Sequence, residues 1–251
     1  MGPVDLANLR IAGDDPLSGA APALGGRGSE AGLDMQHLIV VAHPLQDSVT
    51  MKLARAYAFE LQQLGHSQRT HDLYHMGFNP VMGAHELEPL SIGHAADVDV
   101  AQAQQDVRAA VALTVIYPLW WATMPAMMKG YIDRVFARGF AYEARDGVAK
   151  GLMQGKRCVL ITLSGSPMSM LLDNGEWKAM DTLQDGHIFR SSGFELLEHL
   201  HFDQVEPPTS DEAVERHLAR VRTCARRHFA ANIEDPGAAG NEPAVASRRE
   251  R

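Results

Sequence analysis

Short apolar segments of strand length alternate with segments of helical periodicity along most of this chain, and that alternation limits the folds it can adopt. The segments predicted as strands are 37–42, 67–73, 111–117, 157–162 and 194–201. The segments predicted as helices are 48–64, 98–110, 125–138, 176–192 and 210–233. Because a helix separates each strand from the next, the pattern favours right-handed crossovers and a mostly parallel sheet.

Five strands connected in this way predict an α/β fold, a flavodoxin-like, doubly wound, five-stranded parallel sheet of order 2-1-3-4-5. Such a sheet binds its ligand at the carboxyl ends of the strands, at the switch point between the first and third strands. The loops after strands one, three and four are therefore the places to look for chemistry. The segment 76–97, rich in Gly, Pro and His, is predicted to be irregular.

The two ends of the chain differ in composition from its middle. Residues 1–34 hold 7 of the 22 glycines and 3 of the 13 prolines and keep no periodicity. Such segments bury too little apolar area to offset the entropy of ordering them. The sequence therefore predicts a disordered or loosely ordered tail over 1–35, one domain over 36–232 and a second tail over 233–251. Asp5, Asp14 and Asp15 interrupt the start and argue against a secretory signal.

Composition excludes several classes of protein. The net charge of −8 argues against a nucleic-acid partner, which would require a basic surface. No segment approaches the ~18 consecutive apolar residues of a membrane-spanning helix, so no membrane span is expected. The only cysteines, Cys158 and Cys224, predict two reduced thiols in a cytoplasmic protein.

The loop after the first strand, residues 42–50, opens a helix with Ser and Thr. Hydroxyls and free backbone N–H groups at a helix N-terminus favour an anion such as phosphate. The loop has neither G-x-G-x-x-G nor a Walker motif, which disfavours direct binding of NAD or ATP there. The alternative is that Ser48 serves only as the helix N-cap.

The loops after strands three and four fit a flat, partly polar ligand. The first holds the adjacent Trp120 and Trp121, and loops at strand ends concentrate ligand contacts. The alternative is that one of these rings packs at the helix–sheet junction. The second, 162–167, is small and contains Gly165, so its backbone amides can approach a heterocycle, although an ordinary turn would look the same. A phosphate end and a flat-ring end together match the shape of a flavin nucleotide.

Histidines number 12, which raises the question of a metal site. His199 and His201 share one face of a predicted strand. No third ligand follows at a recognised spacing, and H-E-x-x-H is absent, so no metal is predicted.

Two segments carry a family resemblance. Residues 38–48 and, above all, 117–142, with a tryptophan loop, a proline-started helix ending in Asp-Arg-Val-Phe, and then Gly-Phe-Ala-Tyr, resemble the NAD(P)H:quinone oxidoreductase family of flavodoxin-like proteins. This family includes DT-diaphorase-type and modulator-of-drug-activity-type quinone reductases. The resemblance implies a tightly bound FAD or FMN, NAD(P)H as co-substrate, a homodimer, and ping-pong transfer of a hydride to a quinone.

The resemblance also implies site residues. Those holding the flavin's phosphate or ribityl region would be His43, Ser48 and Thr50. Those cradling the ring, largely through backbone N–H groups, would be Pro118, Leu119, Trp120 and Trp121. Those bonding its pyrimidine edge would be Thr162, Leu163, Ser164 and Gly165. Tyr142 would lie near the substrate pocket at the dimer interface, and Tyr142 and Trp121 are the predicted catalytic residues.

The sequence departs from the family at one place. The family's fourth loop reads Thr-Thr-Gly-Gly, followed by a Tyr and a His that stabilise the charge of the reduced flavin. Here 162–165 reads Thr-Leu-Ser-Gly, and the downstream positions correspond to Met170 and Glu176. This departure leaves open a nitro or azo acceptor in place of a quinone. It also leaves open a flavin-binding ancillary subunit of a transporter or regulator, and less readily a one-electron flavodoxin shuttle.

Overall fold

The structure is a computed structural model that describes residues 36–87, 97–145 and 148–230. The chain divides into two compact units, Met1–Ala31 and Gly32–Arg251, and every described residue belongs to the second. The tails predicted for 1–35 and 233–251 lie outside the described residues, so the predicted domain boundaries stay a prediction.

The centre of the described unit is a five-stranded sheet in which all neighbouring strands are parallel. Its strands are β1 (His37–Val41), β2 (Gln68–Asp72), β3 (Ala112–Pro118), β6 (Arg157–Leu163) and β7 (Glu195–Phe202). This confirms the predicted five-stranded parallel sheet. The order is β2-β1-β3-β6-β7, which differs from the predicted 2-1-3-4-5 only in that a hairpin takes the numbers four and five. Between β3 and β6 the chain forms an antiparallel hairpin, β4 (Tyr142–Arg145) and β5 (Val148–Gly151), that was not predicted.

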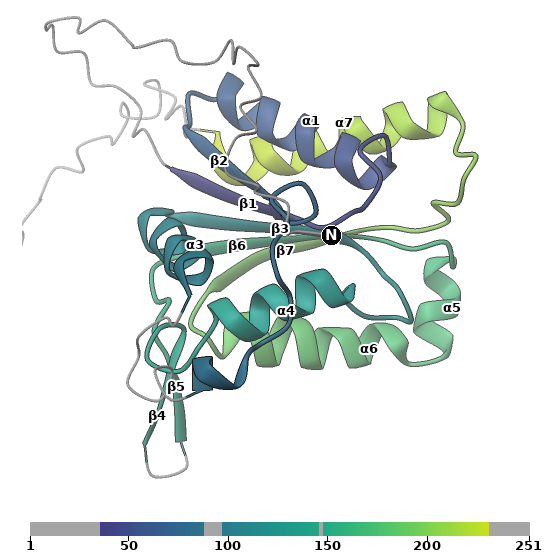
Figure 1. Cartoon of the computed structure of the whole chain (residues 1–251). Coiled ribbons are helices and arrows are strands. Elements are labelled where there is room, and N and C mark those ends of the chain that lie inside the picture. Colours follow the sequence, from purple (N-terminus) through teal and green to yellow (C-terminus); the bar gives the residue numbers. More distant parts are fainter. Residues whose placement is uncertain (1–35, 88–96, 146–147, 231–251) are drawn as a thin grey trace, which may run out of the picture. The chain divides into compact units, whose positions relative to one another are not determined.

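Helices cover both faces of the sheet (Figure 1). Those on one face are α1 (Val49–Gln63) and α7 (Asp211–Phe229). Those on the other are α3 (Val98–Ala109), α4 (Ala126–Val135) and α6 (Glu176–Met180). The predicted helix 176–192 is α6 followed by a π-helical segment, η2 (Asp181–Arg190). Two further short helices, η1 (Ala84–Glu86) and α5 (Met168–Asp173), were not predicted.

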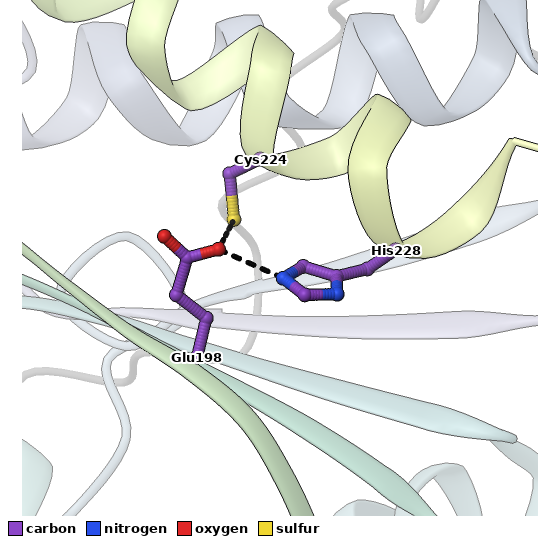
Figure 2. Close-up of side chains that lie close together, drawn as sticks. All are labelled: Glu198, Cys224 and His228. Atoms are coloured by element: carbon purple, nitrogen blue, oxygen red, sulfur yellow. Dashed lines mark hydrogen bonds and ion pairs between the residues drawn. The ribbon is translucent and has the colours of Figure 1, made fainter.

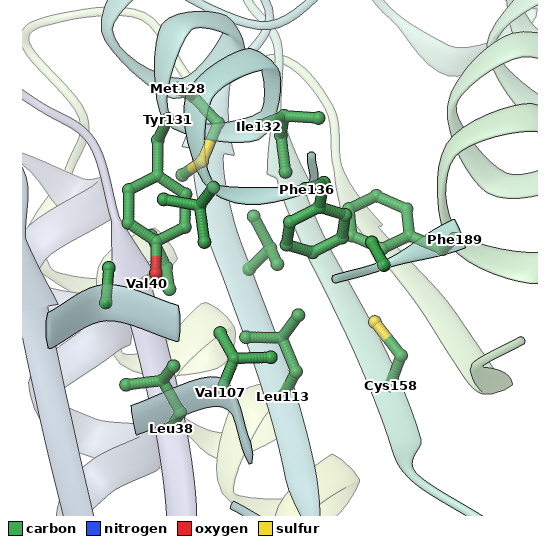
Figure 3. Close-up of a cluster of buried hydrophobic side chains, with 14 of the residues drawn as sticks. Leu38, Val40, Val107, Leu113, Met128, Tyr131, Ile132, Phe136, Cys158 and Phe189 are labelled. Carbon is green, nitrogen blue, oxygen red and sulfur yellow. The ribbon is translucent and has the colours of Figure 1, made fainter. Parts of the chain in front are cut away.

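The core has two parts because side chains on β1 alternate between the faces. Leu38 and Val40 join the cluster under α3 and α4, while Ile39 and Val41 join the cluster under α1 and α7. Figure 3 shows the first cluster, to which α4 contributes Met128, Tyr131 and Ile132. The thiols are likewise separated, with Cys158 in the first cluster and Cys224 in the second, and both are free, as predicted.

A buried arginine holds Asn79, Glu86 and the start of α3. Arg134 on α4 is 1% exposed, and its Nε lies 2.9 Å from Oε2 of Glu86. Its Nη1 donates to the carbonyl oxygen of Asn79 at 2.6 Å and to Asp99, and its Nη2 donates to Asp97. The Arg of the Asp-Arg-Val-Phe motif therefore ties η1 and the start of α3 to α4.

Within the part of the chain that the structure describes, none of the helices is long and apolar enough to cross a membrane.

Candidate active site

A cavity of about 670 Å³ lies where β1, β3, β6 and β7 end. Its volume is within the usual ~300–1,000 Å³ of small-molecule sites. The predicted site residues that line it are His43, Ser48, Thr50, Pro118, Leu119, Trp120, Leu163, Ser164 and Gly165. The sheet thus brings the three predicted loops together at the switch point. Trp121, Thr162 and Tyr142 are not among the lining residues.

One end of the cavity is the N-terminus of α1. The Ser48 hydroxyl accepts a hydrogen bond from the backbone N–H of Met51 at 3.3 Å, which confirms Ser48 as the N-cap. The first turn of α1 carries no acidic residue, and Val49 and Thr50 line the cavity. The backbone N–H groups of a helix's first turn have no partner within the helix, so this end can bind an anion.

His43 lies between this helix terminus and the tryptophan loop. Its Nδ1 is 3.0 Å from the backbone nitrogen of Leu45, and its ring faces Trp120 edge-on with centroids 6.4 Å apart. Partial burial lowers the pKa of His43 below its usual value. The hydrogen bond with the Leu45 carbonyl raises this pKa, but by less. At neutral pH the ring is therefore uncharged and can act as a hydrogen-bond partner but not as a cation.

The tryptophan loop corrects one expectation. The N–H of Leu119 donates to the carbonyl oxygen of Leu163 at 2.6 Å, and the N–H of Trp120 donates to that of Thr123 at 3.0 Å. Proline has no N–H. The N–H groups of Leu119 and Trp120 are therefore not free to bind a ring in this conformation, because strand pairing and a tight turn already use them, while contact of Pro118, Leu119, Trp120 and Trp121 with the ring stays a prediction.

The same turn exposes the tryptophan rings. Trp121 and Ala122 both have φ of 54°, an uncommon conformation for residues other than glycine. The Trp121 side chain is 99% exposed and that of Trp120 is 42% exposed. Neither ring is buried at the helix–sheet junction, so the alternative packing role is wrong for both.

Thr162 is a second correction. It is fully buried, and its hydroxyl lies 2.8 Å from Nε2 of His199 and 2.8 Å from Nδ1 of His201. Strand β6 turns this side chain toward β7, away from the cavity. Only Leu163, Ser164 and Gly165 of the predicted pyrimidine-edge residues reach the cavity.

Sequence reasoning missed the fourth wall of the cavity. This wall follows β7 and consists of Val205, Glu206, Pro207, Thr209 and Val214. A β-carbon on Gly165 would come within 2.6 Å of Oε1 of Glu206, so a larger residue there would displace the Glu206 side chain. The signal was available, because the loop after the last parallel strand must open at the same edge of the sheet.

Tyr142 begins the hairpin strand β4 and is 36% exposed. It lies outside the cavity lining, so this chain alone does not bring the two predicted catalytic residues, Tyr142 and Trp121, into the cavity.

Among the described residues, two groups of side chains have the composition of metal sites, and an arginine is ion-paired with each. Figure 2 shows Glu198, whose Oε2 lies 2.8 Å from Nε2 of His228 and 3.5 Å from the Cys224 sulfur. Nη1 of Arg227 lies 3.0 Å from the same oxygen. Burial, with the nearby Glu198 charge, raises the pKa of Cys224 to about 12, so it is a thiol and not a thiolate ligand.

The second group is His85, Glu86 and Asp97. Its two carboxylates are ion-paired with Arg134. The charge of each group therefore favours an ion-pair network over a bound cation. The pair noted in the sequence, His199 and His201, contacts Thr162, and the absence of a metal stays a prediction.

Residues 35–224 match the sequence model of the family described as flavodoxin-like fold. The chain belongs to this family. An uncharacterized NAD(P)H oxidoreductase of Haemophilus influenzae is 32% identical over 168 residues, 65% of this chain and 81% of that protein. This confirms the resemblance to the NAD(P)H:quinone oxidoreductase family. Several other curated relatives are matched over about half to two thirds of their own length.

Solved structures give the same family. The NAD(P)H:quinone oxidoreductase of Methanothermobacter marburgensis is 27% identical, with a TM-score of 0.68 over 77% of this chain and 96% of that one. An FMN-dependent NADH-azoreductase of Bacillus anthracis, in complex with FMN, has a TM-score of 0.60 over 78% of this chain and 99% of that one. At 17% identity the second likeness shows the fold alone.

Proposed function

We propose that this chain is a flavin-dependent NAD(P)H oxidoreductase that passes two electrons, as a hydride, to a quinone or a similar acceptor. The observation that carries the proposal is one cavity at the switch point of the sheet, with a helix N-terminus at one end and an apolar, tryptophan-bearing loop at the other. That combination fits a ligand with a phosphate at one end and a flat ring at the other.

The lining residues fit such a ligand in detail. The first-turn N–H groups of α1 and the Thr50 side chain would hold the phosphate. Leu119 and Trp120 offer an apolar wall to the ring, and Gly165 permits close approach of the backbone. When bound, the flavin supplies the hydride chemistry, and the protein contributes binding, orientation and electrostatics.

The charge of the cavity is mixed. Asp47 and Glu206 are acidic and Lys52 is basic, so binding of a phosphate would rest on backbone N–H groups rather than on a positive surface. This matches the net charge of −8 of the whole chain. The cofactor is FAD or FMN, and the mass of the released cofactor decides between them.

We place the acceptor site at a homodimer interface. Trp121 and Tyr142 lie outside the cavity of one chain yet expose 99% and 36% of their surface. A second copy would complete the wall over the ring and bring these two predicted catalytic residues to the acceptor. The two buried, free thiols fit the reducing cytoplasm predicted from the sequence.

The test is a spectrum followed by turnover. The purified full-length protein is expected to be yellow, or to become yellow with FMN or FAD, and to bleach within seconds of adding NADH or NADPH. Steady-state assays with a quinone, a nitro compound and an azo dye would then rank the acceptors. A protein that binds neither flavin, or a flavoprotein that reduces none of these acceptors, would refute the proposal.

A further inference from the structure

A chain of hydrogen-bonding side chains leads from the interior to the wall of the cavity. It begins at Asp185 on η2, whose carboxylate oxygens both lie 3.0 Å from Nδ1 of His199. Nε2 of His199 is 2.8 Å from Oγ1 of Thr162, which is 2.8 Å from Nδ1 of His201. Nε2 of His201 is 3.0 Å from Oγ of Ser164, which lines the cavity.

The chain is shielded from water along most of its length. The side chains of Asp185 and His199 are 4% and 6% exposed. The ring of Trp177 lies over both histidines, with centroids 4.8 Å from His199 and 5.3 Å from His201. A buried carboxylate is costly unless it is paired or hydrogen-bonded, and the His199 ring provides that partner for Asp185.

The directions of the hydrogen bonds follow from Ser164, whose hydroxyl has one proton. That hydroxyl donates to the carbonyl oxygen of Ser166 at 2.7 Å. The Ser164 oxygen therefore accepts from His201, which places a proton on Nε2 of His201.

Burial, followed by the neighbouring His199, lowers the pKa of His201 to about 4, with Asp203 and Arg220 acting in opposite directions. At neutral pH His201 thus carries one proton, and its Nδ1 accepts from the Thr162 hydroxyl. Thr162 Oγ1 then accepts from Nε2 of His199, whose Nδ1 donates to Asp185. These hydrogen-bond directions point to a proton on each nitrogen of His199, next to the Asp185 carboxylate.

We propose that Asp185, His199, Thr162, His201 and Ser164 form a proton relay that stores one proton on His199 and delivers one to the cavity through the Ser164 hydroxyl. The inference rests on the proposed function and deepens it. Reduction of a quinone takes one hydride and one proton, and NAD(P)H supplies only the hydride. The relay supplies the proton at the site where hydride transfer leaves negative charge.

Each residue that gives up a proton receives one from the next residue, except His199, which loses one. The Ser164 hydroxyl turns from the Ser166 carbonyl to the anionic product in the cavity and gives up its proton, and Ser164 Oγ takes the proton from Nε2 of His201. Nδ1 of His201 takes the hydroxyl proton of Thr162, and Thr162 Oγ1 takes the proton from Nε2 of His199. His199 ends neutral and still donates to Asp185, and no electrons move along the relay. Water entering the open cavity between turnovers restores the proton by the reverse path.

The relay also accounts for the departure of the fourth loop from the family pattern. The positions corresponding to the family's Tyr and His are Met170 and Glu176, and neither lines the cavity. Here the charge-compensating groups come from β6, β7 and the π-helical segment, and Ser164 links them to the cavity.

The stored proton is testable without any cofactor. Long-range ¹H–¹⁵N spectra of the histidine rings in the ¹⁵N-labelled full chain at pH 7 should show His199 protonated on both nitrogens and His201 protonated on Nε2 alone. Asp185→Asn should make His199 neutral. A neutral His199 in the wild-type protein would overturn the proposal.

Delivery of the proton is tested by removing the central hydroxyl. Thr162→Val keeps the shape of the side chain and interrupts the relay, and it should lower kcat by about tenfold or more, as loss of a proton donor does. The solvent deuterium isotope effect on kcat should rise because proton delivery then limits the rate. Flavin affinity should change by less than about twofold, because Thr162 does not reach the cavity.

Two controls separate this result from a structural defect. Thr162→Ser restores a hydroxyl and should recover kcat to within about twofold of the wild type. Thr114→Val removes an equally buried hydroxyl on the neighbouring strand, where it donates to the Tyr57 hydroxyl, and should leave kcat and the isotope effect unchanged. If the wild-type protein turns over and Thr162→Val has the same kcat and isotope effect, the relay is overturned and the proposed function stands. A wild type without turnover would overturn the relay together with the proposed function.

Discussion

Gly130 on α4 lies so close to Pro80 that a β-carbon on the glycine would come within 2.2 Å of the proline's carbonyl oxygen. This contact lies one helical turn from Arg134, which also binds the 76–87 segment through Asn79 and Glu86. The packing of α4 against that segment therefore depends on a residue without a side chain and on a buried cation.

The close approach predicts that Gly130→Ala destabilises the fold. Overpacking of this kind costs roughly 1–3 kcal/mol, because the backbone of Pro80 must move. Urea unfolding followed by circular dichroism would measure the free energy of unfolding. Lys129→Ala, at a half-exposed position beside it, should change that free energy by about 0.5 kcal/mol or less. Equal effects of the two substitutions would contradict the packing described here.

Arg134→Met is expected to be more damaging. It leaves Glu86, which is 1% exposed, as a buried carboxylate without its cation, and such changes cost about 3–5 kcal/mol. Arg216→Ala breaks the exposed pair with Glu212 and should cost about 1 kcal/mol or less. Thermal and urea unfolding of the two variants would compare them directly. A small loss at Arg134 would mean that the network contributes little to stability.

Trp121→Ala should weaken flavin binding without destabilising the fold. Since the ring is 99% exposed, the free energy of unfolding should stay within about 0.5 kcal/mol of the wild type. Flavin affinity, measured by fluorescence titration of the reconstituted protein, should fall by about tenfold, or roughly 1.4 kcal/mol. Leu183→Ala removes another exposed apolar side chain away from the cavity and serves as the control. Unchanged flavin affinity would remove Trp121 from the proposed site.

His37 predicts a pH dependence of stability. Burial, followed by the nearby His66 and Arg157, lowers the pKa of His37 to about 3, and neither ring nitrogen has a hydrogen-bond partner. Between pH 6.5 and 3 the unfolded chain binds a proton at this position that the folded chain does not. Stability from His37 is therefore present above pH 6.5 and declines as the pH falls toward 3.

His37→Phe should remove this part of the dependence, on the order of several kcal/mol across that window. The phenyl ring would keep the edge-on contact with Phe229, which lies 4.5 Å from the His37 ring. His75→Phe, at an exposed position, should leave the pH profile as it is in the wild type. Parallel profiles for the wild type and His37→Phe would show that His37 is protonated in the folded protein.

Local patterns in the sequence were sufficient for the main sheet and helices. Residues 37–41 are apolar or uncharged in unbroken succession, as expected for a strand buried on both faces, and β1 is that strand. Ser48 and Gly65 mark the ends of α1 through a side-chain cap and a positive φ of 82°. The hairpin β4–β5 was missed because its strands are only four residues long and the second, VAKG, does not alternate apolar and polar residues.

The position of the site could be predicted from the order of the strands, but the direction in which individual side chains point could not. The topology alone places the loops after β1, β3 and β6 at one edge of the sheet. Whether Thr162 points to the cavity or to β7 depends on strand register, which the sequence does not display. His199 is 14 positions from Asp185, and Thr162 is 37 and 39 positions from His199 and His201, so no local sequence motif predicts the network.

The π-helical geometry of η2 sets a limit on how this protein can change. Two consecutive residues of that segment, Gln184 and Asp185, are both buried, one bonded to the Tyr117 hydroxyl and the other to His199. The wider π-helical turn rotates successive residues by a smaller angle than an α-helix does, which helps both side chains to face the sheet. Insertion or deletion of a single residue in 181–190 should therefore disconnect either the β3 contact or the buried acid, even if the helix itself survives. A related chain with a different length at this point is therefore expected to lack one of these two hydrogen bonds.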